Sequence, residues 1–133
     1  MKANELMIGD WVRKLERGGH SIPVKIIAIY EYNADYETRD GNVGCMSIHG
    51  YEPIPLTAEI LEKNGFKYDE FPKFAVNEIT EKTKVTFSYH SGSRTVFMGI
   101  SEPNFNLTSA CVLCVHELQH LLRQSRIEKE IEL

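Results

Sequence analysis

The fold is decided by the stretch Val85-Thr86-Phe87-Ser88-Tyr89-His90 and by the run that follows it. Apolar and polar side chains alternate through this stretch, which is typical of a half-buried β-strand. The turn residues Ser91-Gly92-Ser93 come next, and a second, mostly apolar run covers 95–100. The spacing predicts an antiparallel hairpin, with Phe74 and Val76 as candidates for a further strand of the same sheet.

Three short strand candidates precede this hairpin within the first 50 residues. They cover residues 11–13, 24–30 and 43–48, and each is bounded by turn signals such as Gly9-Asp10 and Asp40-Gly41. Short strands with many turns are typical of small curled sheets. We therefore predict an N-terminal SH3-like, barrel-type sheet, with Trp11 in its core.

Two helices are expected in the remaining sequence. Thr57 is a good N-cap, residues 58–64 are mostly helix formers, and Gly65 is placed to end the helix. A second helix is expected over 117–124. The apolar run 110–115 fits either a buried strand or the first turns of that helix, and the alternation near the end predicts a short last strand from Lys129.

These elements predict an α+β fold in a single domain, residues 1–133. Residues 1–55 form its barrel-like part, and residues 56–133 contain the first helix, the hairpin sheet and the C-terminal helix. The length of 133 residues suffices for one hydrophobic core.

The composition argues against several classes of protein. With 42% hydrophobic and 26% charged residues the chain is too apolar for disorder, and its net charge of −4 makes nucleic acid an unexpected partner. Three cysteines do not make a disulfide framework. Because no secretory or membrane-spanning run is present, we expect a cytoplasmic protein without a membrane partner.

One string matches a catalytic motif. His116-Glu117-Leu118-Gln119-His120 fits H-E-x-x-H, in which two histidines one helical turn apart bind zinc and the glutamate activates its water. The third ligand of the longer motif is missing, because Arg123 and Arg126 stand where glycine and histidine belong. The alternative places His116, Glu117 and His120 on the wet face of a helix. We favour this alternative and expect no metal site.

Cys111 and Cys114 form a C-x-x-C next to these histidines. On a helix the cysteines and histidines would face opposite sides, and on a strand the two cysteines would face apart. We therefore interpret them as small buried apolar residues. Nucleotide-binding glycine loops and the G-x-S-x-G motif are absent from the sequence, so we expect neither a catalytic residue nor a cofactor.

A group of tyrosines gives the best candidates for a binding surface. The candidate residues are Tyr30, Tyr32, Tyr36, Arg39 and Arg94. Exposed tyrosine and arginine are frequent in binding hot spots, although core packing and cross-strand pairing explain such residues equally well.

Three blocks of the chain resemble a known family. They are Met1-Lys2-Ala3-Asn4-Glu5-Leu6 with Ile8-Gly9-Asp10, Glu52-Pro53-Ile54-Pro55-Leu56-Thr57 with Gly65-Phe66, and Val115-His116 with Leu118-Gln119 and Leu121. In this order they resemble small uncharacterised proteins from phages and integrated elements of Bacteroidales. Members tend to have Gln and Asn at the positions of Glu117 and His120, which implies that the metalloprotease string is accidental. The resemblance also implies a strand over 110–115.

The expected function is non-catalytic binding by a phage or mobile-element accessory protein. Its partner would be a protein or a small ligand in the host cytosol, and a homo-oligomer is possible. Two alternatives stay open. One is a counter-defence protein that sequesters a nucleotide signal, using Tyr30 or Tyr36 for stacking and Arg39 or Arg94 for phosphate. The other is a zinc-dependent hydrolase that uses His116, Glu117 and His120.

Overall fold

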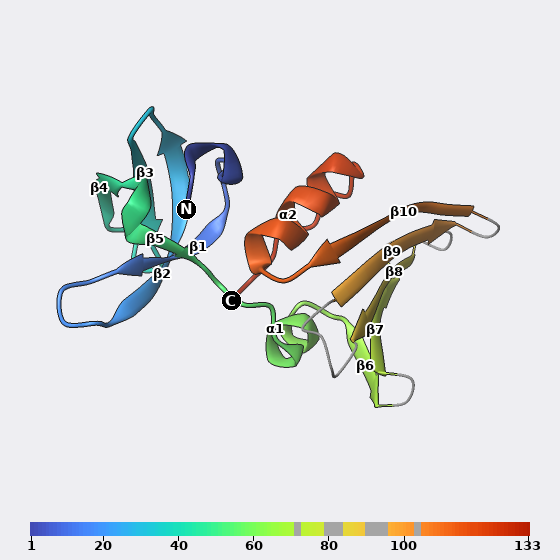
Figure 1. Ribbon diagram of the computed structural model, residues 1–133. Helices are drawn as coiled ribbons and strands as arrows, with labels where there is room; N and C mark the ends of the chain where they lie inside the picture. The colour runs from blue at the N-terminus through green and yellow to red at the C-terminus, as the bar shows by residue number, and fades with distance from the viewer. Residues whose placement is uncertain (71–72, 79–83, 90–95, 103–104) are drawn as a thin grey trace. The chain divides into compact units, whose positions relative to one another are not determined.

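The computed structural model describes residues 1–70, 73–78, 84–89, 96–102 and 105–133, and it describes side chains within 1–66 and 112–133. The chain groups into two compact units, Met1–Pro55 with Cys114–His120 and Leu56–Leu113 with Leu121–Leu133. Each unit contains a five-stranded sheet, and two α-helices complete the fold (Figure 1). The predicted α+β class is confirmed, whereas the single domain stays a prediction.

The first sheet has the order β4-β3-β2-β1-β5, and its strands are antiparallel. The strands are β1 (Trp11–Leu15), β2 (Ser21–Ile29), β3 (Asn33–Thr38), β4 (Val43–Ser47) and β5 (Tyr51–Pro53). The short 3-10 helices η1 (Ala3–Glu5) and η2 (Ile48–Gly50) precede β1 and β5. The SH3-like detail stays a prediction, because β4 and β5 are the two edges of the described strands.

The core of the first unit is apolar and includes one buried phenol. Its buried side chains are Leu6, Val12, Val24, Ile26, Ala34, Ile48 and Tyr51. The Tyr51 hydroxyl donates a 2.7 Å hydrogen bond to the Ala34 carbonyl, so its polar end is satisfied. Trp11 is only half-buried and lies outside this cluster, which corrects the prediction that it is a core residue.

Strand β3 was not predicted from the sequence. Its residues Asn33 and Asp35 disfavour strands in isolation. Here β3 pairs with both β2 and β4, and its buried Ala34 belongs to the core. Cross-strand pairing and core packing therefore override the weak local preference.

The second sheet is a meander of consecutive antiparallel strands in the order β10-β9-β8-β7-β6. The strands are β6 (Lys67–Glu70), β7 (Lys73–Glu78), β8 (Lys84–Tyr89), β9 (Val96–Glu102) and β10 (Phe105–Val112). The β8–β9 pairing confirms the predicted hairpin, with Phe87 opposite Met98. Strand β7 confirms the strand candidate at Phe74 and Val76. The predicted turn at 91–93 and Arg94 lie outside the described residues.

Helix α1 (Ala58–Lys63) follows the predicted local signals. The Thr57 hydroxyl oxygen accepts a 3.3 Å hydrogen bond from the Ile60 N–H, so this residue is the N-cap. Gly65 has φ of 82° and ends the helix in the left-handed conformation that suits glycine.

Helix α2 (Val115–Gln124) begins two residues earlier than predicted, directly after β10 ends at Val112. The apolar run 110–115 is therefore shared between a strand and a helix. The predicted last strand is wrong, because residues 125–133 form no strand. Ile127 and Ile131 are buried in this irregular segment.

Candidate functional site

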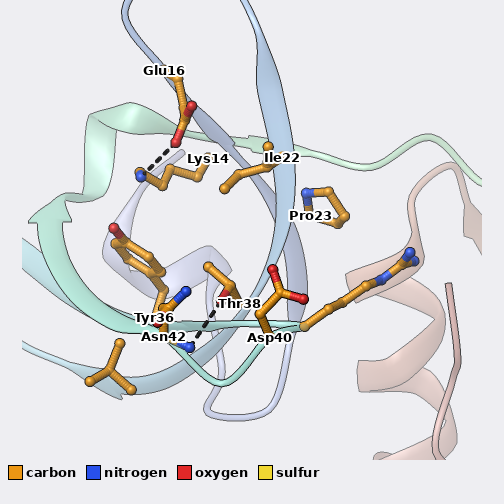
Figure 2. Close-up of a pocket in the computed structure, with 10 residues that line it drawn as sticks. Lys14, Glu16, Ile22, Pro23, Tyr36, Thr38, Asp40 and Asn42 are labelled. Atoms are coloured by element: carbon orange, nitrogen blue, oxygen red, sulfur yellow. Dashed lines mark hydrogen bonds and ion pairs between the residues drawn. The ribbon is translucent and has the colours of Figure 1, made fainter.

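A pocket of about 500 Å³ opens on the first sheet, between the β1–β2 hairpin and the β3–β4 turn. Figure 2 shows Lys14, Ile22 and Pro23 across the opening from Tyr36, Thr38 and Asn42. Its lining mixes charged, aromatic and apolar side chains, namely Lys14, Glu16, Ile22, Pro23, Tyr36, Thr38, Arg39, Asp40, Asn42 and Val43. Its volume lies in the range of pockets that hold small molecules.

Tyr36 provides the aromatic wall of the pocket. Its ring meets the ring of Tyr51 edge-to-face, with centroids 6.3 Å apart. Across the strand pair it lies opposite Gly44, and a Cβ on Gly44 would approach the Tyr36 hydroxyl oxygen to 2.5 Å. The absence of a side chain at Gly44 therefore leaves the space that the phenol occupies.

Lys14 places an ammonium group beside this ring. Its Nζ lies 4.8 Å from the Tyr36 ring centroid and 3.0 Å from Oε1 of Glu16. A hydrogen bond to Tyr36 is the main cause that raises the pKa of Lys14, and a hydrogen bond to Glu16 raises it further. Lys14 is therefore positively charged at neutral pH, but part of its hydrogen-bonding capacity is already used.

The β3–β4 turn carries the second cation, Arg39. Thr38 and Asn42 close the turn with two hydrogen bonds, of 2.8 Å from the Thr38 N–H to the Asn42 carbonyl and of 3.1 Å from the Asn42 N–H to the Thr38 hydroxyl. Arg39 is exposed, and it makes no ion pair or hydrogen bond with any residue that the structure describes. Its guanidinium is therefore available to a ligand.

Two of the five predicted binding residues line the pocket, Tyr36 and Arg39. Tyr30 and Tyr32 do not: they are 54% and 70% exposed, and the Tyr30 hydroxyl donates a 3.0 Å hydrogen bond to Oδ2 of Asp35. Arg94 lies outside the described residues. Lys14 and Asn42 were missed, because their place at the pocket depends on β3 pairing with its neighbours.

Within the H-E-x-x-H string, the side chain of Glu117 caps the start of helix α2. Its Oε2 accepts a 3.1 Å hydrogen bond from the N–H of Cys114, the residue that precedes α2. The Cys114 carbonyl accepts the first helical hydrogen bond, from the Leu118 N–H. Glu117 therefore occupies the third helical position and satisfies a backbone donor at the helix start, as the glutamate of a capping box does.

The two histidines are not both on a wet face, which corrects the sequence interpretation. His116 is only 6% exposed, and its Nδ1 is buried without a hydrogen-bond partner. His120 is half-buried, and its Nε2 lies 2.7 Å from Oδ2 of the fully buried Asp10. The imidazole rings of the two histidines meet edge-to-face with centroids 5.6 Å apart.

Gln119, between these histidines, holds the segment that precedes β1. Its Oε1 accepts a 2.9 Å hydrogen bond from the Trp11 N–H, and its Nε2 donates a 3.0 Å hydrogen bond to the Gly9 carbonyl. Because Gln119 is buried, both bonds replace water at backbone groups. With the contact of His120 to Asp10, neighbouring helix residues bind three consecutive residues, 9–11.

Of the two cysteines predicted to be buried, Cys114 is half-buried, and the Cys111 side chain lies outside the described part. Cys45, for which no burial was predicted, is exposed. Burial raises the pKa of the Cys114 thiol to about 11. This thiol is therefore protonated at neutral pH and is a poor nucleophile.

Among the residues that the structure describes, no three His, Cys, Asp or Glu side chains form a group that could hold a metal ion. Within the same part of the chain, no helix is long and apolar enough to cross a membrane. No protein-family model, curated protein or solved structure matches the chain.

Proposed function

We propose that this chain is a non-catalytic, cytoplasmic binding protein whose ligand occupies the pocket on the first sheet. This proposal rests on three residues around one opening: Tyr36, Lys14 and Arg39, the last without a partner among the described residues. Small-molecule sites combine apolar or aromatic walls with convergent polar groups, and this opening has both, with six polar or charged residues among the ten that line it. The phage or mobile-element origin implied by the family resemblance belongs to this proposal.

The charges of the lining define the class of ligand. Lys14 and Arg39 are balanced by Glu16 and Asp40, so the lining as a whole is neutral. Lys14 already pairs with Glu16 at 3.0 Å, which leaves Arg39 as the cation for an anionic ligand group. A ligand with one anionic group and a flat apolar part fits this pocket better than a polyanion, because repulsion by Asp40 and Glu16 grows with ligand charge.

A nucleoside monophosphate belongs to this class, so the pocket also favours the nucleotide-sequestering alternative. Arginine binds phosphate through paired hydrogen bonds, and tyrosine rings contact nucleobases. In this version the protein would lower the free concentration of a host nucleotide signal. Tyr36 and Arg39 are the residues that would contact it.

Two contacts of α2 favour binding over the zinc hydrolase. Glu117 would have to activate a metal-bound water, but its carboxylate caps the helix at Cys114. His120 would have to bind the metal through an imidazole nitrogen, but its Nε2 is bonded to Asp10. Glu117 would need to leave the Cys114 N–H, and His120 would have to bind the metal through Nδ1 or leave Asp10, before a hydrolytic site could form.

The proposal is tested by two-dimensional ¹H–¹⁵N NMR with adenosine monophosphate and ribose 5-phosphate as probes. We expect saturable shifts at the amides of Lys14, Tyr36 and Asn42, larger with the nucleotide. Arg39→Gln should weaken binding roughly tenfold or more, the loss expected when a charged hydrogen-bond donor is removed. Arg17→Gln, an exposed arginine outside the pocket lining, is the matched control.

The two probes separate the outcomes. Binding of both probes with equal affinity would support an anion site and contradict the nucleotide version. If neither probe shifts the pocket amides, or if Arg17→Gln weakens binding as much as Arg39→Gln, the ligand class proposed for this pocket is wrong.

A further inference from the structure

Strand β4 is an edge of the first sheet with a free row of backbone groups. In an antiparallel pair, every second residue of a strand forms hydrogen bonds with its neighbour. On either side of β4, Asn42 accepts a hydrogen bond from the Thr38 N–H, and the Ile48 N–H donates one to the Tyr32 carbonyl. By the same alternation, Val43, Cys45 and Ser47 turn their N–H and C=O groups away from β3. These three residues also have exposed side chains.

The two edges of this sheet differ in how they are protected. Edge strands of monomeric proteins are usually short, or carry a charge, a proline or a bulge that blocks further pairing. Strand β5 has three residues, including Glu52 and Pro53. Strand β4 has five residues without charge or proline, and it pairs with β3 without a bulge. Of the two edges of the first sheet as described, β4 is therefore the one open to another strand.

We propose that β4 is the self-association surface of the protein, where a second copy pairs antiparallel about a two-fold axis at Cys45. In this register Cys45 lies opposite its own symmetry mate, and Val43 lies opposite Ser47 of the second copy. This inference does not require the ligand proposed for the pocket, although Val43 belongs both to the pocket lining and to β4.

The charge pattern favours a second copy as the occupant. Because β4 has no charged residue, pairing with a second copy brings no like charges opposite each other. For the same reason β4 offers no complementary charge to a charged peptide. Asp35 is the nearest acidic residue, paired with Cys45 on β3. With strands about 4.8 Å apart, the two Asp35 positions are about 14 Å apart, beyond the Debye length at physiological salt. A five-residue edge buries little surface, so the dimer should be weak and reversible.

Analytical ultracentrifugation across the micromolar range tests this surface. The wild type should show a concentration-dependent monomer–dimer equilibrium. Cys45→Lys should raise the dimer dissociation constant roughly fivefold or more, because two ammonium groups then meet at the axis. The substitution should leave the monomer folded, because residue 45 is exposed on the edge strand. Ile8→Lys is the control: Ile8 is 64% exposed, comparable to Val43 at 69%, and lies outside β4.

Cross-linking gives a second measurement. In the Cys111→Ser/Cys114→Ser variant, a short bismaleimide should link two chains through Cys45. Because its hydrogen bond to Asp35 raises the pKa of the Cys45 thiol, the reaction is best run at mildly alkaline pH. A wild type that stays monomeric throughout, a dimer as stable in Cys45→Lys as in Ile8→Lys, or a dimer without Cys45 cross-linking would each overturn the proposal.

Discussion

Gly44 faces Tyr36 across β3 and β4, and its missing side chain sets the position of the pocket's aromatic wall. A Cβ at Gly44 would lie 2.5 Å from the hydroxyl oxygen and 2.7 Å from Cζ of Tyr36. The phenol cannot bend, so the whole ring would have to move. Since Lys14 lies over this ring, a displacement of Tyr36 would also change the cation beside it.

We predict that Gly44→Ala destabilises the protein by about 1–3 kcal/mol, the usual range for overpacking, and weakens ligand binding in the pocket. Urea unfolding gives the free energy. Gly50→Ala is the control: its Cβ would meet the terminal methyl of Met46, a flexible side chain that can rotate away. Equal losses in the two variants would contradict the role of Gly44.

His116 is the residue for which the structure predicts a pH effect. Burial lowers the pKa of His116 below its usual 6.5, against the smaller opposing attraction of Asp10, Glu117 and Glu5; His120 lowers it further. The folded state therefore keeps His116 neutral where an unfolded histidine already binds a proton. Its contribution to stability is complete above pH 6.5 and is lost progressively as the pH falls through and below that value.

We predict that His116→Leu reduces the loss of unfolding free energy between about pH 7.5 and about pH 5.5. At the higher pH the variant should be about as stable as the wild type or more stable, because Nδ1 of His116 has no partner to lose. Chemical unfolding at both pH values measures this. His20 is exposed, so the control variant His20→Leu should lose as much unfolding free energy between the two pH values as the wild type. If His116→Leu also loses as much as the wild type, burial of His116 does not cause the pH dependence.

At the scale of elements, both helices end in the same hydrogen-bond pattern with different residues. After α1 the Phe66 N–H bonds to the Leu61 carbonyl, and after α2 the Ile127 N–H bonds to the Leu122 carbonyl. Both are Schellman motifs, which need one residue in the left-handed conformation. That residue is Gly65 after α1, but Arg126, with φ of 58°, after α2.

We predict that Arg126→Gly stabilises the protein by up to about 1 kcal/mol, because glycine adopts this conformation without strain. The reciprocal change Gly65→Ala should destabilise it by a similar amount. Thermal unfolding of the two variants beside the wild type measures both effects. A loss of stability in Arg126→Gly would mean that side-chain contacts of Arg126 outweigh its backbone strain.

Elements with local signals were predictable and elements held by distant partners were not. Helix α1 was predicted because Thr57 and Gly65 both lie within one turn of its ends. Strand β3 was missed because its stability comes from pairing on both sides. The first turn of α2 was not predictable, because the side chain that caps it is Glu117, whose place in the H-E-x-x-H string equally suits a catalytic role.

At the scale of the whole molecule, the end of the chain shows how a side chain can take the place of a strand. Alternation after Ile127 predicted a last strand. Instead, Asn64 binds the backbone of Glu132: its Nδ2 donates a 2.7 Å hydrogen bond to the carbonyl, and its Oδ1 accepts a 2.8 Å hydrogen bond from the N–H. The alternation in the sequence indicated correctly that Ile127 and Ile131 are buried. It did not indicate which group forms hydrogen bonds with the backbone of this segment.

The candidate site was predictable only in part for the same reason. Tyr36 and Arg39 were selected by residue type, and they meet in one pocket. Tyr30 and Tyr32 were selected by the same rule and lie outside its lining. Lys14 is 22 positions before Tyr36 in the sequence, so only the pairing of β1, β2 and β3 brings it to the ring. Residue type identifies candidates, whereas sheet register decides which of them share a site.

We propose that this chain binds a small anionic ligand in the pocket on its first sheet and does not use a zinc site. Native mass spectrometry tests it directly, on protein purified without chelator and then mixed with adenosine monophosphate. We predict a metal-free chain that binds one nucleotide, with occupancy lost in Arg39→Gln and kept in Arg17→Gln. One zinc per chain that disappears in His116→Ala, or a nucleotide occupancy that does not depend on Arg39, would show that this binding function is wrong.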